Sequence, residues 1–171
     1  MFDHLSGATR ISIVVGDPIA QVRSPALVSE RMVERGYDGI LIPVQIGAED
    51  LSAFMRAINQ TKNIDGIIAT VPHKFAAFEH CARVSERANL LGAVNVMRRD
   101  RDGGWSGENV DGPGFVAGLR AAGLDPKGRR ALLAGAGGAG SAIALELMNA
   151  GVYRSRSTTS RASDVTTCSV G

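Results

Sequence analysis

Three polar residues in the middle of the chain have the types and spacing expected of a proton-transfer site. Lys74 ends the segment GIIATVPHK, Asn95 lies in GAVNV, and Asp111 lies in GENVDG. An ammonium, an amide and a carboxylate together can bind a small polar substrate and exchange the proton of its alcohol group. Each residue also has a structural explanation, because lysines in first helical turns are usually solvated and Asn and Asp often cap strands, turns or helices.

The elements that must position these residues alternate between strands and helices. The β-branched runs at residues 10–16 and 64–69 predict strands, and the second of them runs into a turn and a helix that starts with Pro72. A hairpin over residues 93–106 is expected to carry Asn95 toward the same crevice. This order favours an α/β fold with a parallel-type sheet and binding loops at the strand ends.

The loop after the first strand contains a candidate ligand for a carboxylate. Ser24 and Pro25 predict the start of a helix that Gly36 stops. Two interpretations of Ser24 remain open. Its hydroxyl is an N-cap, or it joins the free N–H groups of the helix start in binding a carboxylate.

The next elements supply core and surface. Residues 39–46 predict a second strand, which Pro43 places at a sheet edge or at an irregular position. His73 is expected on a helix surface, with contact to the substrate as the alternative, and Phe75 is expected in the core. Residues 48–60 predict an amphipathic helix because apolar side chains recur at helical spacing; they are Leu51, Phe54, Met55 and Ile58.

A nucleotide-binding pattern begins the C-terminal part. Residues 130–134 predict an apolar strand, and a helical pattern follows a glycine-rich segment, which is the context of a dinucleotide fingerprint. Residues 153–171 are polar and do not resemble a buried parallel strand. We therefore expect an incomplete or atypical nucleotide lobe after about residue 152, in a truncated or frame-shifted chain. The glycine-rich segment comprises Gly135, Ala136, Gly137, Gly138, Ala139 and Gly140.

Composition bounds the class of protein. The chain has 171 residues, 44% of them hydrophobic and 21% charged, which is ordinary for a soluble globular protein. A net charge of +2 gives no reason to expect nucleic acid or a membrane as partner. Cys81 and Cys168 have no metal-like spacing or adjacent base, and no histidine pair suggests a metal site. Without a signal peptide pattern, we expect a cytoplasmic protein with reduced thiols.

Five segments, in order, resemble those of the shikimate dehydrogenase family. The resemblance implies NADP-dependent reversible reduction of 3-dehydroshikimate to shikimate, or of a related compound such as quinate, in the pathway to chorismate and aromatic amino acids. NAD is an alternative cofactor. The segments are GDPIAQVRSP at residues 16–25, IATVPHK at 68–74, GAVNV at 92–96, GENVDGPG at 107–114 and GAGGAG at 135–140.

The same resemblance implies roles for the candidate residues. Lys74 would exchange the hydroxyl proton and Asp111 would share its network, while Ser24 would bind the carboxylate of a small hydroxy acid. Thr70 and Asn95 would bind ring hydroxyls, and the glycine-rich segment the cofactor. Residues 1–111 would form the substrate-binding domain and residues 112–171 the start of a Rossmann domain, with the crevice between them as the site.

The chain departs from the family pattern at five positions, so a substrate other than shikimate, such as quinate, is also consistent with it. An alternative is a catalytically inactive fragment that binds a small carboxylate and that covers its exposed sheet edge by forming a homodimer. The five departures are Gln21, Val22, Ile68, Val96 and Val110.

Overall fold

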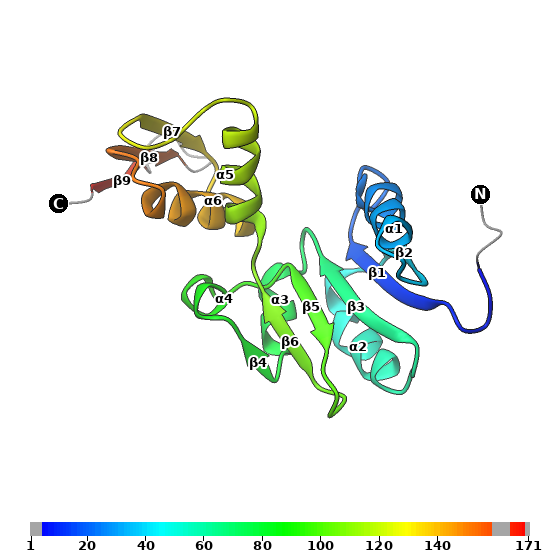
Figure 1. Cartoon of the computed structure of the whole chain (residues 1–171). Helices are drawn as coiled ribbons and strands as arrows, with labels where there is room; N and C mark the ends of the chain where they lie inside the picture. The colour runs from blue at the N-terminus through cyan, green and yellow to red at the C-terminus, as the bar shows by residue number, and fades with distance from the viewer. Residues whose placement is uncertain (1–4, 159–164, 170–171) are drawn as a thin grey trace. The chain divides into compact units, whose positions relative to one another are not determined.

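The computed structural model describes residues 5–158 and 165–169, which form two compact units (Figure 1). The units are residues Met1–Glu108 and Asn109–Gly171, so the division falls close to the boundary expected at about residue 111. The first unit contains β1 (Arg10–Gly16), α1 (Ser24–Glu34), β2 (Gly39–Gln45), the 3₁₀ turn η1 (Ala48–Asp50), α2 (Leu51–Asn59), β3 (Ile64–Ala69), α3 (Lys74–Glu79), β4 (Arg83–Val84), α4 (Glu86–Leu91), β5 (Val96–Arg99) and β6 (Trp105–Glu108).

A six-stranded sheet with the order β2-β1-β3-β5-β6-β4 forms the centre of the first unit. β1 pairs in parallel with both β2 and β3, whereas β5 runs antiparallel to β3 and β6. The predicted α/β class with a parallel-type sheet is therefore confirmed, as is the hairpin. β2 lies at one edge of the sheet, and Pro43 is exposed there, as predicted.

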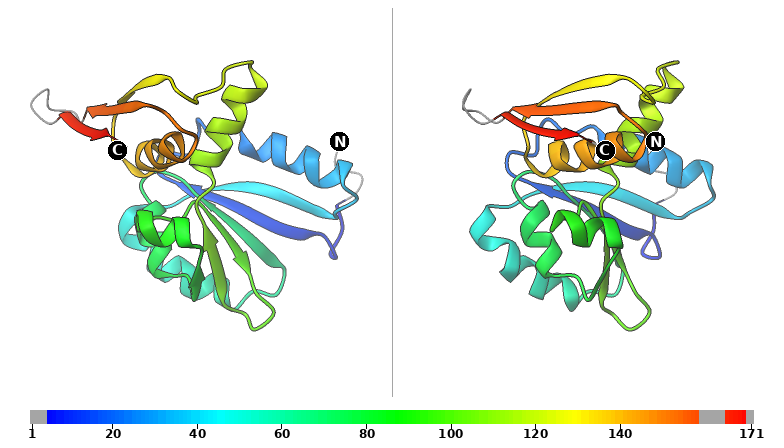
Figure 2. Two further views of the ribbon diagram at one scale, coloured as in Figure 1. Left: turned by 60° about the vertical axis from the view of Figure 1, so that its left-hand side comes forward. Right: turned by 90° about the vertical axis from the view of Figure 1, so that its left-hand side faces the viewer.

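Helices cover both faces of this sheet (Figure 2). The side chains of β1 accordingly alternate between two cores, one on each face. Ile13 and Val15 belong to the larger core, and Val14 belongs to a smaller one. From α2, the predicted residues Leu51, Met55 and Ile58 are buried in the larger core and Phe54 packs against it.

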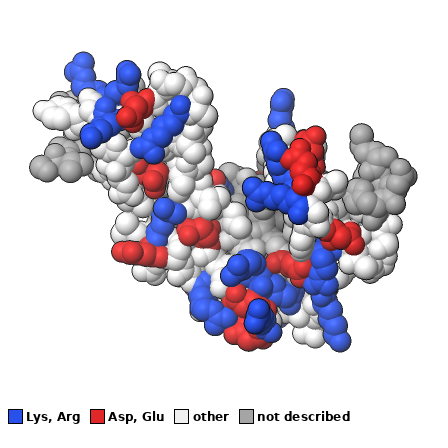
Figure 3. All heavy atoms as spheres, viewed as in Figure 1, with Lys and Arg blue, Asp and Glu red and all other residues white. Residues whose placement is uncertain are grey.

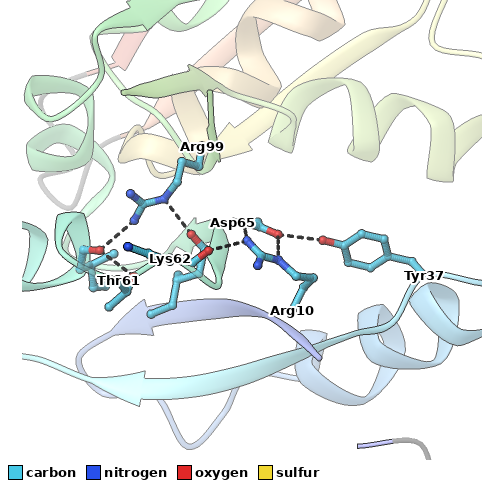
Figure 4. Close-up of polar contacts among 8 residues, drawn as sticks. Arg10, Tyr37, Thr61, Lys62, Asp65 and Arg99 are labelled. Carbon is cyan, nitrogen blue, oxygen red and sulfur yellow. Dashed lines mark hydrogen bonds and ion pairs between the residues drawn. The ribbon is translucent and has the colours of Figure 1, made fainter. Parts of the chain in front are cut away.

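A network of polar side chains fastens the amino-terminal ends of β1 and β3 (Figure 4). Asp65 on β3 accepts hydrogen bonds from both Nε and Nη2 of Arg10, and the hydroxyl of Tyr37 donates to Asp65 Oδ2 over 3.1 Å. Arg10 Nη2 also donates to the carbonyl oxygen of Lys62 over 2.8 Å. The hydrogen bonds from Arg10 hold the pKa of the Asp65 carboxyl below its usual value.

Replacing Asp65 with asparagine should therefore lower the free energy of unfolding by about 0.5–1 kcal/mol at neutral pH, because solvent screens this partly exposed pair. The folded-state pKa of Asp65 is depressed, so its contribution is complete above the unfolded-state pKa of about 4 and is lost as the pH falls through the folded-state pKa. Urea denaturation of both proteins between pH 7 and pH 2 measures this. The two curves should converge in acid, and a difference that is independent of pH would contradict the assignment. Glu30→Gln, an exposed acid on α1, is the control.

A second cluster joins the hairpin to the end of α2. Trp105 is 2% exposed and donates from Nε1 to Asn59 Oδ1 over 2.8 Å. The guanidinium of Arg99 lies 4.6 Å from the centroid of the Trp105 ring. It also donates to the backbone oxygens of Ile58 and Ile64, each over 2.8 Å. These contacts hold the β5–β6 hairpin in register with the rest of the sheet.

The second unit has a three-stranded sheet with the order β7-β8-β9. β8 pairs in parallel with β7, and β9 runs antiparallel to β8. The expectation that the polar tail forms no parallel strand was wrong, because ladder hydrogen bonds are made by backbone groups, which a polar sequence also has. Its elements are α5 (Asp111–Ala121), β7 (Arg130–Ala134), α6 (Gly138–Asn149), β8 (Arg154–Thr158) and β9 (Val165–Ser169).

Charge is mixed on the face drawn in Figure 3, where basic and acidic side chains lie interspersed, in line with the net charge of +2. Among the described residues, no helix has the length and apolar character needed to cross a membrane. Over those same parts of the chain, no group of three His, Cys, Asp or Glu side chains could hold a metal ion.

Candidate functional site

Lys74 is the first residue of α3 and is only 9% exposed. A turn separates it from the carboxyl end of β3, and this turn is closed by a hydrogen bond from the N–H of His73 to the carbonyl oxygen of Thr70 over 2.7 Å. Pro72 lies within this turn, so the prediction that it opens the helix was wrong by two residues. Lys74, which is proposed to transfer a proton, is thus the first residue of this helix.

Asn95 is brought close to the same place by backbone hydrogen bonds. The N–H of Val94 donates to the carbonyl oxygen of Lys74, and the N–H of Ala69 donates to the carbonyl oxygen of Asn95, each over 2.9 Å. Asn95 is 6% exposed. The structure therefore places Lys74 and Asn95 on two segments that are hydrogen-bonded to each other.

Thr70 directly follows β3 and is held against the end of β1. Its N–H donates to the carbonyl oxygen of Val15 over 2.9 Å, and the N–H of Asp17 donates to the carbonyl oxygen of Val71 over 2.9 Å. A Cβ at Gly16 would lie 2.5 Å from Thr70 Cγ2, so only glycine permits this approach. Backbone hydrogen bonds of Thr70 and its neighbour Val71 thus connect the segments that follow β1 and β3.

Ser24 starts α1 at the end of the loop that follows β1. The N-cap residue is Arg23, and no side chain caps this helix, so the N-cap interpretation of Ser24 was wrong. Its binding to a carboxylate stays a prediction. Because β1 and β3 are parallel neighbours, Ser24, Thr70 and Lys74 all follow carboxyl ends of adjacent strands.

His73 differs most from what the sequence indicated. It is 1% exposed, so the prediction of a helix-surface histidine was wrong. Its Nε2 lies 2.8 Å from the carbonyl oxygen of Ile46, which follows β2. No local sequence signal identifies this contact, because its acceptor is a backbone atom 27 residues away. Phe75, expected in the core, is 53% exposed.

Asp111 is the first residue of α5 and belongs to the second unit, whereas Lys74 belongs to the first. The pairing of the two therefore stays a prediction. The N–H of Asp111 donates to Asn109 Oδ1 over 3.2 Å, and Asn109 is fully buried. Asn109 thus shapes the turn that presents Asp111, a role that the sequence analysis missed although an asparagine two residues before a helix is a common turn signal.

The glycine-rich segment has the geometry that a pyrophosphate cradle needs. Gly135 follows β7 with φ of 97°, which favours glycine, and a Cβ at Gly140 would lie 2.3 Å from the carbonyl oxygen of Gly135. The N-cap of α6 is Gly137, and no side chain caps this 12-residue helix. Its first N–H groups therefore have no intrahelical partner and favour an anion. These residues fit a dinucleotide.

Cys81 is not suited to nucleophilic chemistry. Burial raises the pKa of its thiol to about 11, so the thiol is protonated at neutral pH. This agrees with the expectation that the residue is not a nucleophile. The side chain of Cys168 lies outside the described ones.

Fold and geometry together define a class of protein. The first unit has a lysine and an asparagine buried near the end of β3, and the second has a strand, a glycine-rich loop, a helix and a parallel strand in succession. This arrangement is that of an α/β protein with a small-molecule domain followed by a nucleotide-binding type of domain.

Comparison with known proteins identifies the family. Residues 14–97 match the family model described as the shikimate dehydrogenase substrate binding domain. The shikimate dehydrogenase (NADP(+)) of Acidiphilium cryptum is 42% identical over 147 residues, which are 86% of this chain and 52% of that relative. The relative from Rubrobacter xylanophilus is 34% identical over 90% of this chain and 54% of its own length.

Solved structures give the same result. Shikimate 5-dehydrogenase from Listeria monocytogenes, in complex with shikimate and NAD, matches with a TM-score of 0.83 at 27% identity, over 96% of this chain and 56% of its own. The Thermus thermophilus enzyme in complex with NADP(H) and shikimate matches with a TM-score of 0.80 at 32% identity, over 89% and 56%. The chain is thus similar to shikimate dehydrogenases over most of its own length, and it spans about half the length of the curated relatives that it matches.

Proposed function

We propose that the chain serves the NADP-dependent reversible reduction of 3-dehydroshikimate to shikimate, or of a related compound such as quinate. The observation that carries this proposal is the hydrogen-bonded frame that holds the buried Lys74 beside the segment of Asn95. Both residues lie within the region that matches the family's substrate-binding domain. The names of the relatives supply the reaction.

Substrate binding would use three further side chains of the first unit. Ser24 would bind the carboxylate, because it stands at an uncapped helix start where free N–H groups also favour an anion. Thr70 and Asn95 would bind ring hydroxyls from the strand ends that carry them. The single serine in this loop, with Val22 in the place of a second one, would give a weaker carboxylate contact.

Proton transfer would be performed by Lys74, with Asp111 in the same network. As the hydroxyl of shikimate is oxidised, the amine of Lys74 would take its proton, and in the reverse direction the ammonium would donate a proton to the new alkoxide oxygen. The cofactor would accept or supply the hydride at the same ring carbon. Asp111 would orient the hydroxyl and stabilise the ammonium form.

The cofactor would be held by Gly135, Ala136, Gly137, Gly138, Ala139 and Gly140. NADP is proposed because the curated relatives from Acidiphilium cryptum and Rubrobacter xylanophilus are named as NADP(+) enzymes. NAD is the alternative, since the structural neighbour from Listeria monocytogenes was solved in complex with it. Either dinucleotide would place its pyrophosphate at the start of α6.

We also propose that the protein acts in the cytoplasm and assembles as a homodimer. The cytoplasm suits a reaction whose substrate and cofactor are small dissolved molecules. Dimerisation is supported by β7, which is an edge strand of its sheet and carries Leu132 with 75% exposure. Analytical ultracentrifugation measures the assembly, and a monomer at micromolar concentration would remove the dimer proposal alone.

Titration calorimetry with shikimate and with quinate tests the substrate proposal. We expect a dissociation constant between about 1 μM and 1 mM for one of them, since Michaelis constants generally fall in this range. Ser24→Ala should weaken binding by about tenfold, the loss of one hydrogen bond to a charged group. Ser29→Ala on the same helix is the control. Ser29 is not a proposed substrate ligand, since its Oγ accepts a hydrogen bond from the N–H of Leu41. Absence of binding by both compounds would overturn the proposal.

A further inference from the structure

We propose that His73 is a positioning residue for Lys74. Its imidazole ties the turn that precedes α3 to the end of β2 and so fixes the place of the lysine amine. This inference rests on the proposed function of Lys74 and adds to it a residue that neither the family comparison nor the sequence pattern assigns a role.

The hydrogen bond of the ring has a defined direction. Nε2 of His73 lies 2.8 Å from the carbonyl oxygen of Ile46, and a carbonyl oxygen only accepts, so Nε2 carries the proton. Ile46 is itself held, because its N–H donates to the carbonyl oxygen of Gly16 over 3.2 Å. The imidazole therefore connects the turn after β3 to a loop that is already fastened to β1.

The backbone on either side of Lys74 is also tied down. The N–H of His73 donates to the carbonyl oxygen of Thr70 and its carbonyl oxygen accepts from the N–H of Ala77, each over 2.7 Å. The carbonyl oxygen of Lys74 accepts from the N–H of Val94 over 2.9 Å. The side chain of His73 supplies the one bond of this set that reaches β2.

Helix α3 cannot fix the lysine by itself. It has six residues, Lys74–Glu79, and helices this short are unstable without tertiary contacts. His73 is its N-cap residue, yet no side chain caps the helix, because the imidazole is used for the contact with Ile46 instead. The hydrogen bond from His73 to Ile46, called the tether below, thus takes the place of a helix cap. Besides stabilising the helix, the tether sets its position.

Packing alone does not account for a histidine at this place. Nδ1 is buried and has no hydrogen-bond partner among the described residues, although His73 is 1% exposed. An unpaired buried nitrogen destabilises the folded state by at least as much as the bond made by Nε2 stabilises it. Stability would therefore be served as well by an aromatic ring without nitrogen. The advantage of the imidazole is the fixed position that it gives to the next residue.

Three variants separate the tether from the volume of the ring. His73→Gln keeps an N–H donor near the position of Nε2, His73→Asn is too short to reach Ile46, and His73→Phe fills the space without a donor. We expect His73→Phe and His73→Asn to lower kcat by about 10–100-fold with KM changed less than about threefold, because misplacing a reacting group by about 1 Å has this effect. His73→Gln should stay within about threefold of the wild type.

A second readout does not depend on turnover. Acylation of Lys74 by an N-hydroxysuccinimide ester, followed by peptide mass spectrometry and normalised to the exposed Lys62, reports how firmly the amine is held. The rate should rise at least about fivefold in the two variants without the tether and stay unchanged in His73→Gln, in line with opening of a locally packed segment. If the wild type shows no turnover, the proposed function fails and this rate still decides the role of His73.

The proposal is overturned if His73→Phe keeps the wild-type kcat and the wild-type labelling rate of Lys74. It is also overturned if His73→Gln falls as far as His73→Phe, because the bond to Ile46 would then not be the cause. Thermal melting of each variant identifies folding defects. Should His73→Phe fail to fold, the comparison of His73→Gln with His73→Asn decides the outcome alone.

Discussion

Replacing Lys74 with methionine should lower kcat for shikimate oxidation by about 10²–10⁴-fold while KM changes by less than about tenfold. Methionine has nearly the length and apolar stem of lysine, so it should fill the same buried space, in which Lys74 is 9% exposed. It has no proton to exchange. Steady-state rates with varied shikimate at saturating NADP⁺ measure both constants.

The matched control for this change is Lys62→Met. Lys62 is an exposed lysine of the same unit, and its contact with Arg10 uses its backbone oxygen, so the substitution should leave kcat and KM unchanged. Equal losses in binding and in rate for Lys74→Met would assign Lys74 to substrate binding instead of proton transfer. Unchanged kinetics would remove it from the site.

Replacing Gly140 with alanine should abolish cofactor binding. The new Cβ would lie 2.3 Å from the carbonyl oxygen of Gly135, where the nearest atom belongs to the backbone and cannot turn aside. The loop before α6 would have to move, and the N–H groups proposed to bind the pyrophosphate would move with it. We expect the affinity for NADP⁺ to fall by at least about 100-fold, equivalent to about 2.7 kcal/mol.

The control and the contradicting outcome for Gly140 can be read from the same calorimetric titrations. A Cβ at Gly118, in the interior of α5, would meet no atom within 4 Å. Gly118→Ala should keep the affinity for NADP⁺ and raise the unfolding free energy by about 0.5–1 kcal/mol. Shikimate should still bind to Gly140→Ala, because its proposed ligands lie in the first unit. Unchanged affinity for NADP⁺ would show that the glycine-rich segment is not the cofactor site.

The elements with strong local signals could be predicted from the sequence. The apolar spacing of Leu51, Met55 and Ile58 predicts α2 because a helix brings these positions to one face, where they are buried. The β-branched run of β1 and the proline at the edge of β2 likewise report local preferences. The context of the glycine-rich segment is also local, since the strand, the turn and the helix are consecutive in the chain.

The predictions that failed depend on contacts between distant parts of the chain. His73 is buried because the carbonyl of Ile46 lies within reach, and this follows from the pairing of β1 with both β2 and β3. The start of α3 was placed at Pro72, yet the bond from His73 to Thr70 closes a turn there. Ser24 has the sequence of an N-cap, but the helix begins one residue earlier than a capping serine would allow.

The candidate site was predicted in part for the same reason. Lys74, Asn95 and Asp111 were expected at one crevice, and backbone hydrogen bonds join the segments of Lys74 and Asn95. The pairing with Asp111 and the role of Thr70, which the family resemblance implies, stay predictions. The buried Asn109 and the tether made by His73 were missed. The turn signal of Asn109 was overlooked, whereas the acceptor of His73 is a backbone oxygen 27 residues away, which the sequence does not identify.

The measurement that tests the central claim most directly is the reduction of NADP⁺ by the 171-residue chain in the presence of shikimate, followed by the absorbance of NADPH. We predict formation of NADPH that saturates with shikimate or quinate and is lost in Lys74→Met. The contradicting result is that neither substrate yields NADPH under conditions in which calorimetry shows the protein saturated with both ligands. The proposed dehydrogenase activity would then be wrong.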